Sequence, residues 1–303
     1  ASIQAAIDDA VDGDEVVVAP GVYYEKLNYG SRKIAIRSVG GSEVTYLDGN
    51  NQNGNLVRCD NVSGPGAILE GFTLWYAQGG HAVYTNDADL LVRDCELLFN
   101  FDSAAYLNRG TPVFERCRFE GNNTGSGGAA FLTDTNARFL ECEFLENTAS
   151  NGGALWGRYS NGVPVVVDCD FVGNVASTHG GAIRAQEGCR IDVDDCRFID
   201  NRARLGGAVA MDSSDLTIDA STFESNTASD HGGAIYHYNC TSPMLADCVL
   251  AANSAEDFGG AIYHYNSIYP FMERCEIVAC NADRGGGLYL ETTDNGFFDS
   301  NLI

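Results

Sequence analysis

Apolar and polar residues alternate in short runs along most of this chain, and glycine, asparagine and aspartate separate the runs. Residues 139–144 are typical, with the sequence FLECEF. Alternation with a period of two is typical of a strand with one buried face, whereas an amphipathic helix has a period of about 3.6 residues. Because the repeated part of the chain lacks the helical period, the pattern predicts many short β-strands.

These runs belong to one repeated unit, roughly C-x-F-x-x-N followed by Gly-Gly-Ala, which occurs seven times from Cys117 onward. Weaker copies lie at Cys95 and around Phe72. From Cys95 the steps between first positions are 22, 25, 27, 27, 25, 27 and 27 residues. Regular steps of this size indicate stacked coils and not a globular domain with a closed centre. The first positions are Cys95, Cys117, Cys142, Cys169, Cys196, Ser221, Cys248 and Cys275.

A coil of this length has room for three short strands and three turns. Stacking such coils pairs each strand in parallel with its equivalents at about 4.8 Å. Leucine-rich repeats have a similar period, but their L-x-x-L-x-L frame is missing here. The expected fold class is therefore all-β, a single-stranded parallel β-helix of about ten coils.

Each repeat position then has a physical role. The cysteine, the phenylalanine and the apolar residue three before the cysteine are expected to face inward as columns of like side chains. The asparagine column suits left-handed turns, and its amides can bond from coil to coil. The glycine pair permits a second bend. The third apolar column contains Val92, Phe114, Phe139, Val166, Val193, Ile218, Leu245 and Met272.

The two ends of the chain differ. Residues 2–12 are expected to form a capping helix, because Ser2 suits an N-cap, Ile3, Ile7 and Val11 share one face, and Gly13 suits the end. Such a helix would block the open strand edges of the first coil. Residues 1–303 then form one domain, with a capping helix over 1–13, irregular coils over 14–70 and regular repeats over 71–303. Residues 297–303 enter another copy, so we expect the natural chain to continue beyond 303.

Two parts of the sequence resemble known families. Residues 3–25, IQAAIDDAVDGDEVVVAPGVYYE, are similar to the N-terminal signature of secreted pectate-lyase-like β-helix proteins. The GGAI motifs at 232–235 and 259–262, combined with F-x-x-N, resemble the repeats of chlamydial polymorphic outer membrane proteins. These resemblances imply right-handed coiling and a secreted or cell-surface location. They leave activity open, since this fold carries lyases, hydrolases and adhesins.

Composition narrows the partners. There are 42 acidic and 18 basic side chains, for a net charge of -24, and this makes nucleic acid an unfavourable partner. No run of 18 apolar residues is available for a membrane span. The eleven cysteines lack C-x-x-C spacing, so we expect stacked buried thiols and no metal centre, although Cys59, Cys189, Cys240 and Cys280 lie outside the column. Calcium remains a candidate cofactor at Asp168/Asp170 and Asp192/Asp194/Asp195, where solvated carboxylates are the favoured interpretation.

The strand after each Gly-Gly pair is the most suggestive surface. One set of alternate positions is apolar and must face inward, and in this set His237 and His264 are expected to form a stacked, hydrogen-bonded core pair. The other set should project outward along a flat face suited to sugar rings or a protein partner, unless its tyrosines merely stack for stability. The outward set is Phe131, Trp156, Arg158, Arg184, Gln186, Asp212, Tyr236, Tyr238, Tyr263, Tyr265, Tyr289 and Glu291.

Two functions fit this surface. The favoured one is a structural or adhesive module, secreted or at the cell surface, that binds an extracellular glycan or a surface protein and can self-associate through its coil ends. The alternative is a polysaccharide lyase or glycoside hydrolase, with Arg158, Arg184 and Asp212 as candidate catalytic groups and Glu187 nearby. His179 and His231 precede glycine pairs, where solvated turn residues are expected. The regular coils favour binding, with a hint of a bulge only at 158–162, whereas a groove walled by residues 26–66 would favour catalysis.

Overall fold

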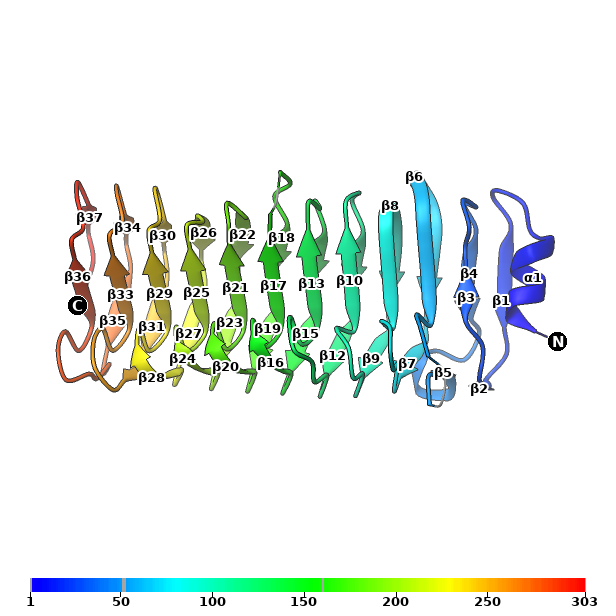
Figure 1. The fold of residues 1–303 in the computed structure, drawn as a ribbon, viewed down its shortest axis with the longest axis horizontal. Helices are drawn as coiled ribbons and strands as arrows, with labels where there is room; N and C mark the ends of the chain where they lie inside the picture. Colours follow the sequence, from blue (N-terminus) through cyan, green and yellow to red (C-terminus); the bar gives the residue numbers. More distant parts are fainter. Residues whose placement is uncertain (1, 51–52, 160, 303) are drawn as a thin grey trace.

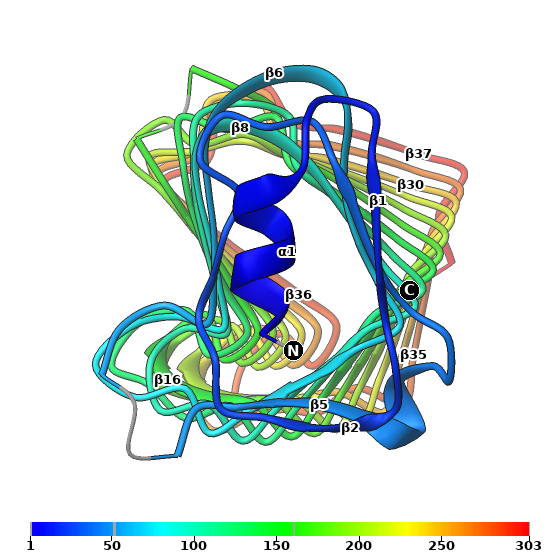
Figure 2. The ribbon, with the colours of Figure 1, turned by 90° about the vertical axis from the view of Figure 1, so that its right-hand side faces the viewer.

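The computed structural model describes residues 2–50, 53–159 and 161–302, so Ser160 in the expected bulge at 158–162 lies outside the described residues. The chain winds into an elongated solenoid whose coils stack along one axis (Figure 1). Seen along that axis, each coil has three sides, and a ridge projects from one corner (Figure 2). Every pairing between the strands of successive coils is parallel, as the repeat predicts.

The first face of the solenoid consists of the strands that follow the Gly-Gly pairs and of the strands that pair with them in the first coils. These are β3 (Leu27–Asn28), the first part of β6 (Val57–Glu70), the first part of β8 (Val83–Arg93), β10 (Ala105–Asn108), β13 (Ala130–Thr133), β17 (Leu155–Arg158), β21 (Ile183–Gln186), β25 (Val209–Asp212), β29 (Ile235–Tyr238), β33 (Ile262–Tyr265) and β36 (Leu288–Glu291).

The second face precedes the cysteine column. It contains the second parts of β6 and β8 together with β1 (Glu15–Val18), β4 (Ala35–Ser38), β11 (Val113–Glu115), β14 (Arg138–Leu140), β18 (Val165–Val167), β22 (Ile191–Asp194), β26 (Leu216–Asp219), β30 (Met244–Ala246), β34 (Phe271–Glu273) and β37 (Phe297–Asp299).

The third face holds eleven strands, one in each successive coil. They are β2 (Gly21–Tyr23), β5 (Thr45–Asp48), β7 (Thr73–Trp75), β9 (Glu96–Leu98), β12 (Arg118–Glu120), β15 (Glu143–Leu145), β19 (Asp170–Val172), β23 (Arg197–Ile199), β27 (Thr222–Glu224), β31 (Val249–Ala251) and β35 (Glu276–Val278). A short 3-10 helix, η1 (Ser42–Val44), precedes β5.

The ridge is a fourth, smaller sheet, which the sequence did not predict. Its five strands are β16 (Thr148–Asn151), β20 (Val175–His179), β24 (Arg202–Leu205), β28 (Thr227–His231) and β32 (Ser254–Ala255). They lie between the asparagine column and the Gly-Gly pairs, so the ridge stands beside the first face (Figure 2).

The interior contains the predicted columns. The phenylalanines of the third face are completely buried and stack almost parallel, as in Phe171 and Phe198, whose ring centroids are 4.8 Å apart with an interplanar angle of 5°. The cysteine column is buried as well, and its seven cysteines are free thiols. Cys59, Cys189 and Cys240, which lie outside that column, are also buried in the core. Buried thiols of this kind act as small apolar side chains.

The asparagine ladder is confirmed, with one correction. Asn147 Nδ2 donates to Asn174 Oδ1 at 3.0 Å and to the carbonyl of Phe119 at 3.0 Å, and its neighbours repeat the pattern. The left-handed residue, however, precedes the asparagine, as in Glu146 with φ 52°. The asparagine itself must point inward to bond along the column, so its neighbour makes the bend.

The glycine pairs carry separate constraints. Gly180 has φ +62°, a conformation that favours glycine. Gly181 has ordinary φ, but a Cβ atom there would lie 2.1 Å from the carbonyl oxygen of Gly207. The first glycine therefore makes the bend, and the second allows successive coils to approach closely.

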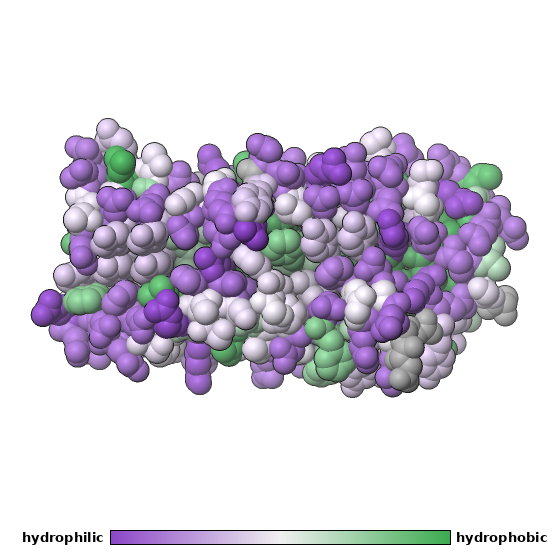
Figure 3. All heavy atoms as spheres, in the orientation of Figure 1, coloured by the Kyte–Doolittle hydropathy of each residue, from purple (hydrophilic) through white to green (hydrophobic). Residues whose placement is uncertain are grey.

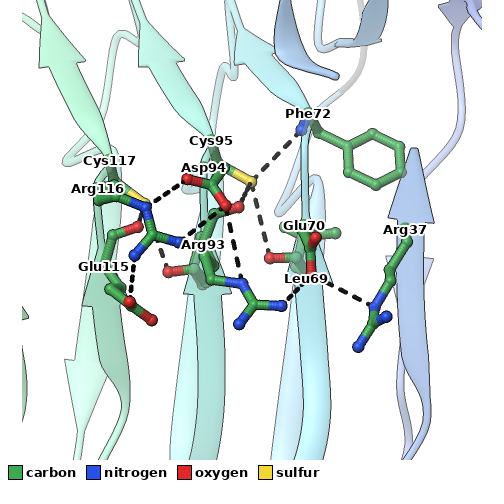
Figure 4. Close-up of polar contacts among 11 residues, drawn as sticks. Arg37, Leu69, Glu70, Phe72, Arg93, Asp94, Cys95, Glu115, Arg116 and Cys117 are labelled. Atoms are coloured by element: carbon green, nitrogen blue, oxygen red, sulfur yellow. Dashed lines mark hydrogen bonds and ion pairs between the residues drawn. The ribbon is translucent and has the colours of Figure 1, made fainter. Parts of the chain in front are cut away.

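The first coils lack the asparagine ladder, which begins at Asn100. Ion pairs cross them instead, along the outside of the second face (Figure 4). Glu70 bridges Arg37 and Arg93 at 3.3 and 2.5 Å, and Asp94 pairs with Arg116 at 2.8 Å. Exposed pairs contribute little individually, about 0–1 kcal/mol each, but a connected row holds irregular neighbouring coils in register.

The N-terminal helix α1 (Ile3–Asp9) covers the open end of the first coil (Figure 2). Ser2 caps it by accepting from the Ala5 amide, and Ile3 and Ile7 are buried, as expected. The helix is shorter than predicted, because Ala10 is extended and the Val11 amide bonds to Asp14. Val11 is consequently 65% exposed, and Gly13 lies beyond the helix end.

Candidate functional site: a groove on the first face

One outward column on the first face is largely aromatic. Strand pairing places these residues opposite one another from coil to coil, and the column reads Tyr84, Tyr106, Phe131, Trp156, Arg184, Ala210, Tyr236, Tyr263 and Tyr289. Of the predicted outward set, this column contains Phe131, Trp156, Arg184, Tyr236, Tyr263 and Tyr289. A second outward column, two residues later in each strand, is mostly polar and contains Arg158, Gln186, Asp212, Tyr238, Tyr265 and Glu291.

The sequence predicted a flat face, but the face is not flat, because the ridge rises along the aromatic column. Ridge residues form a facing column, with Asn151, His179, Leu205, His231 and Phe258 aligned by parallel pairing. Trp156, Tyr236 and Tyr263 are consequently only 8%, 8% and 4% exposed. We call this channel, with the aromatic column as its floor and the ridge as one wall, the groove. Figure 3 shows the face that carries it, where polar and weakly polar atoms surround small apolar areas.

Toward the N-terminal coils the groove widens into a cleft of about 410 Å³. Its floor is aromatic: the rings of Phe131 and Trp156 meet edge to face with centroids 5.0 Å apart, and Tyr106 lies 5.4 Å from Phe131. None of the cleft's lining residues comes from segment 26–66. The lining residues are His81, Asp102, Ser103, Tyr106, Thr124, Gly125, Ser126, Phe131, Trp156 and Arg158.

His81 is a cleft residue that the sequence analysis missed. Its Nδ1 lies 2.8 Å from the Ser103 carbonyl oxygen, so Nδ1 carries the hydrogen and the neutral ring has its lone pair on Nε2. Burial lowers the pKa of His81, which keeps the ring neutral near pH 7. His81 lies outside the copies with the clear cysteine signature, so no repeat position marked it.

Arg158, at the other side of the cleft, is held by an ion pair. Its Nε and Nη2 donate to Glu187 at 2.9 and 3.2 Å, and Nη2 also donates to the Tyr159 hydroxyl at 2.6 Å. The bond to Glu187 raises the pKa of Arg158, and the same bond lowers the pKa of Glu187. Arg158 is therefore a fixed cation and a poor candidate for a general base.

On the next coil, Arg184 contacts the ridge. Its Nη1 donates to Asn151 Oδ1 and lies 3.1 Å from His179 Nδ1. Burial, followed by the charge of Arg184, lowers the pKa of His179 to about 4. His179 is thus a neutral partner of Arg184 and not the solvated turn residue that the sequence suggested. Asp212 makes no contact with Arg184, and its Oδ1 accepts a bond from Ser213 Oγ at 3.0 Å.

Toward the C-terminal coils, ridge side chains fill the groove. Leu205 packs with Ala210, Tyr236 and Tyr263 in a small apolar cluster separate from the main core. His231 stacks on Tyr263 with centroids 4.9 Å apart, and other aromatic rings pack against the cluster's edge. Tyr238 and Tyr265, in the polar column, stay half-exposed and stack with centroids 5.2 Å apart.

The inward histidine pair is confirmed. His237 and His264 are buried, and their Nδ1 atoms are 2.7 Å apart, so one donates to the other. Burial lowers the pKa of His264 to about 3 and that of His237 well below its usual range. Both rings are neutral core side chains and do not reach the groove.

Among the described residues, no group of three or more histidine, cysteine, aspartate or glutamate side chains is arranged to hold a metal ion. Of the aspartates considered for calcium, Asp170 pairs with Arg197 at 2.9 Å and Asp192 with Arg190 at 3.1 Å. Within the described part of the chain, no helix is both long and apolar enough to span a membrane.

Comparison with known proteins agrees with this architecture. Residues 159–303 match a family model described as "Right handed beta helix region". Among solved structures, the A-module of the mannuronan C-5 epimerase AlgE6 from Azotobacter vinelandii is similar, with a TM-score of 0.53 and 10% identity over 99% of this chain and 93% of that one. A GH87 alpha-1,3-glucanase catalytic domain bound to tetrasaccharides aligns with a TM-score of 0.49 and 10% identity, over 99% of this chain and 67% of the other. No curated protein matched the chain.

The chain is therefore a right-handed parallel β-helix protein with a short N-terminal helix. Its distinguishing feature is the groove beside the ridge, with an open aromatic cleft at one end and a closed aromatic cluster at the other.

Proposed function

We propose that this protein is a secreted or cell-surface β-helix module that binds an extracellular polysaccharide along the groove without changing it chemically. The observation that carries the proposal is the pair of half-exposed rings Tyr106 and Phe131, aligned along the solenoid axis at the floor of an open cleft that the largely buried Trp156 also lines. Aromatic faces bordered by polar groups suit sugar rings, which have both apolar and hydroxyl-bearing surfaces.

The dimensions of the cleft support a sugar ligand. Its volume of about 410 Å³ lies within the range of about 300–1,000 Å³ typical of small-ligand sites. The lining residues of the cleft come from several successive coils, so an extended ligand there can contact more than one coil. The similar epimerase module, whose name describes an enzyme acting on mannuronan, also supports a carbohydrate ligand.

Other partners have weaker support. The net charge of -24 disfavours nucleic acid. A surface protein remains an alternative occupant of the half-exposed Tyr238 and Tyr265. Self-association through a coil end is a further alternative.

One observation favours the catalytic alternative, a polysaccharide lyase or glycoside hydrolase. The cleft contains a neutral histidine, His81, with an unprotonated Nε2, and the cation Arg158. A base and a cation are the groups that proton abstraction beside a carboxylate needs. The earlier candidates fit less well, because Glu187 holds Arg158 and Asp212 does not contact Arg184.

The test is a panel of acidic and neutral polysaccharides, with and without calcium, scored for binding and for reducing ends or unsaturated products. Trp156→Ala should weaken the binding of a glycan ligand about 10- to 30-fold, because a central aromatic side chain is lost from the cleft. Trp75→Ala removes the other tryptophan of the chain, which lies on the third face, and this variant should leave binding unchanged. Equal losses in both variants would contradict binding in the groove. Products that disappear in His81→Gln would establish the catalytic alternative.

A further inference from the structure

Ten of the sixteen arginines form ion pairs with carboxylates. Of the six that have no such ion pair among the described residues, Arg109, Arg138, Arg202 and Arg284 are exposed. Arg184 is half-buried on the groove floor, and no described carboxylate lies within ion-pair distance of it. Burial lowers the pKa of its guanidinium, and the more distant charges of Asp212 and Glu187 act in the opposite direction. A cation in such a position needs a counter-charge, and the described residues do not provide one in contact.

The contacts of Arg184 determine what the groove offers at this point. An arginine has only donors, so His179 Nδ1 must accept the bond from Arg184 Nη1. His179 therefore carries its hydrogen on Nε2. Asn151 Oδ1 is occupied by Arg184 Nη1 and by the Thr178 hydroxyl. The acceptors around Arg184 are thus engaged, whereas the remaining hydrogens of Arg184 and the Nε2 hydrogen of His179 are donors.

Two further donors at this level of the groove lack protein acceptors. Arg184 Nε and Trp156 Nε1 are both buried without a hydrogen-bond partner in the described part of the chain. They are neighbours in register, because Trp156 pairs with Arg184 between β17 and β21. Eight other buried side-chain atoms among the described residues also lack a partner, so the indication of a ligand comes from two such donors lying side by side in the groove.

We propose that Arg184, together with His179, forms a subsite for an oxyanion substituent, a carboxylate or a sulfate, on the polysaccharide whose sugar rings lie in the adjacent cleft. This inference rests on the proposed function and specifies the ligand class as an acidic glycan. A planar guanidinium matches a carboxylate or sulfate with two parallel hydrogen bonds. Since the protein as a whole carries a charge of -24, recognition of the anion depends on these short contacts and not on long-range attraction.

The experiment measures binding of matched ligand pairs at constant ionic strength by calorimetry and tryptophan fluorescence. The pairs are an oligogalacturonate with its carboxyl-reduced counterpart, and dextran sulfate with dextran. The wild-type protein should bind at least one acidic member tenfold or more tightly than its neutral partner, and the better pair identifies carboxylate or sulfate. Arg184→Gln should reduce the affinity for the acidic member to that of the neutral one.

Two controls make the result decisive. Arg202→Gln removes an equal charge from an exposed position on β24 and should leave both affinities unchanged. Arg184→Lys keeps the charge and should recover only part of the preference, since an ammonium group lacks the two-pronged geometry. Each variant is compared by thermal unfolding, so that lost folding is separated from lost binding.

The outcomes separate the two proposals. Neutral and acidic glycans that bind equally, with binding lost in Trp156→Ala, would overturn the oxyanion subsite and retain glycan binding. Equal losses in Arg184→Gln and Arg202→Gln would show non-specific charge effects and would also overturn the subsite. Absence of binding to either ligand pair would overturn the subsite as stated, and the broader panel would then decide the proposed function.

Discussion

The two halves of the groove have the same floor and different walls. In the N-terminal half, Tyr106 and Phe131 face Thr124 and Ser126, and the floor stays open as a cleft. In the C-terminal half, Leu205 and His231 stand on the ridge, and the tyrosines beneath them are almost fully buried. The aromatic column alone does not create a binding surface. The size of the facing ridge side chain decides whether a floor ring is available to a ligand or belongs to the core.

The largest expected effect concerns the buried His237–His264 pair beneath the closed half. The folded-state pKa of His264, about 3, lies below the ordinary value of 6.5, so the unfolded chain binds more protons between these pH values. The pair's contribution to stability is thus complete above pH 6.5 and is lost as the pH falls toward 3. For His264 the loss amounts to at most about 5 kcal/mol at 1.36 kcal/mol per pKa unit.

Chemical denaturation between pH 7 and pH 4 measures this effect. The matched control is the double variant His237→Met/His264→Leu. It replaces each histidine with the residue type found on the neighbouring coil in the same column, Met211 beside His237 and Leu290 beside His264. Its free energy of unfolding should fall less steeply with acid than that of the wild type. Identical slopes would show that the pair does not contribute to the acid sensitivity.

The second prediction compares one floor residue from each half. Tyr263→Ala should lower the free energy of unfolding by about 3–5 kcal/mol, because a buried ring is lost from the closed cluster. Tyr106→Ala should cost about 1 kcal/mol or less in stability and should instead weaken glycan binding, because its ring is only partly buried. Urea denaturation and glycan titration of both variants measure these two effects. Equal stability losses in the two variants would contradict the division into an open and a closed half.

The smallest expected effect comes from opening the closed half. Leu205→Ala should reduce stability by about 2 kcal/mol and uncover Tyr236. Burial raises the pKa of Tyr236 to about 12, and exposure should return the pKa toward 10, which ultraviolet titration of the phenol detects. Ala203→Gly, on the same ridge strand, is the control and should not change the titration of Tyr236. An unchanged pKa in Leu205→Ala would show that the ridge leucine does not close the groove.

Much of the fold was predictable because it depends on a local period. A period of two assigns each strand residue to the inside or the outside, and the repeat length determines that like positions stack. The cysteine, phenylalanine and asparagine columns and the inward His237 and His264 followed from this arithmetic. The N-terminal helix was predicted too long, because the helical pattern did not show that the Val11 amide donates to the Asp14 carboxylate instead of continuing the helix.

The candidate site was predicted only in part. Parity placed Trp156, Arg184 and Tyr236 on the outside, but it did not show that the segment after each asparagine folds back as a ridge. Neither the cleft at His81 nor the pairing of Arg184 with His179 has a signal in the sequence, because each joins residues from different segments and coils.

For this protein the sequence by itself determined the coil, its period and the side of the strand on which each residue lies, since these depend on spacing along one chain. Only the tertiary structure decided which outward residues are exposed, which neighbours the half-buried Arg184 contacts and where a ligand fits. Those properties depend on the distance between the ridge and the floor, and side chains from neighbouring coils set that distance.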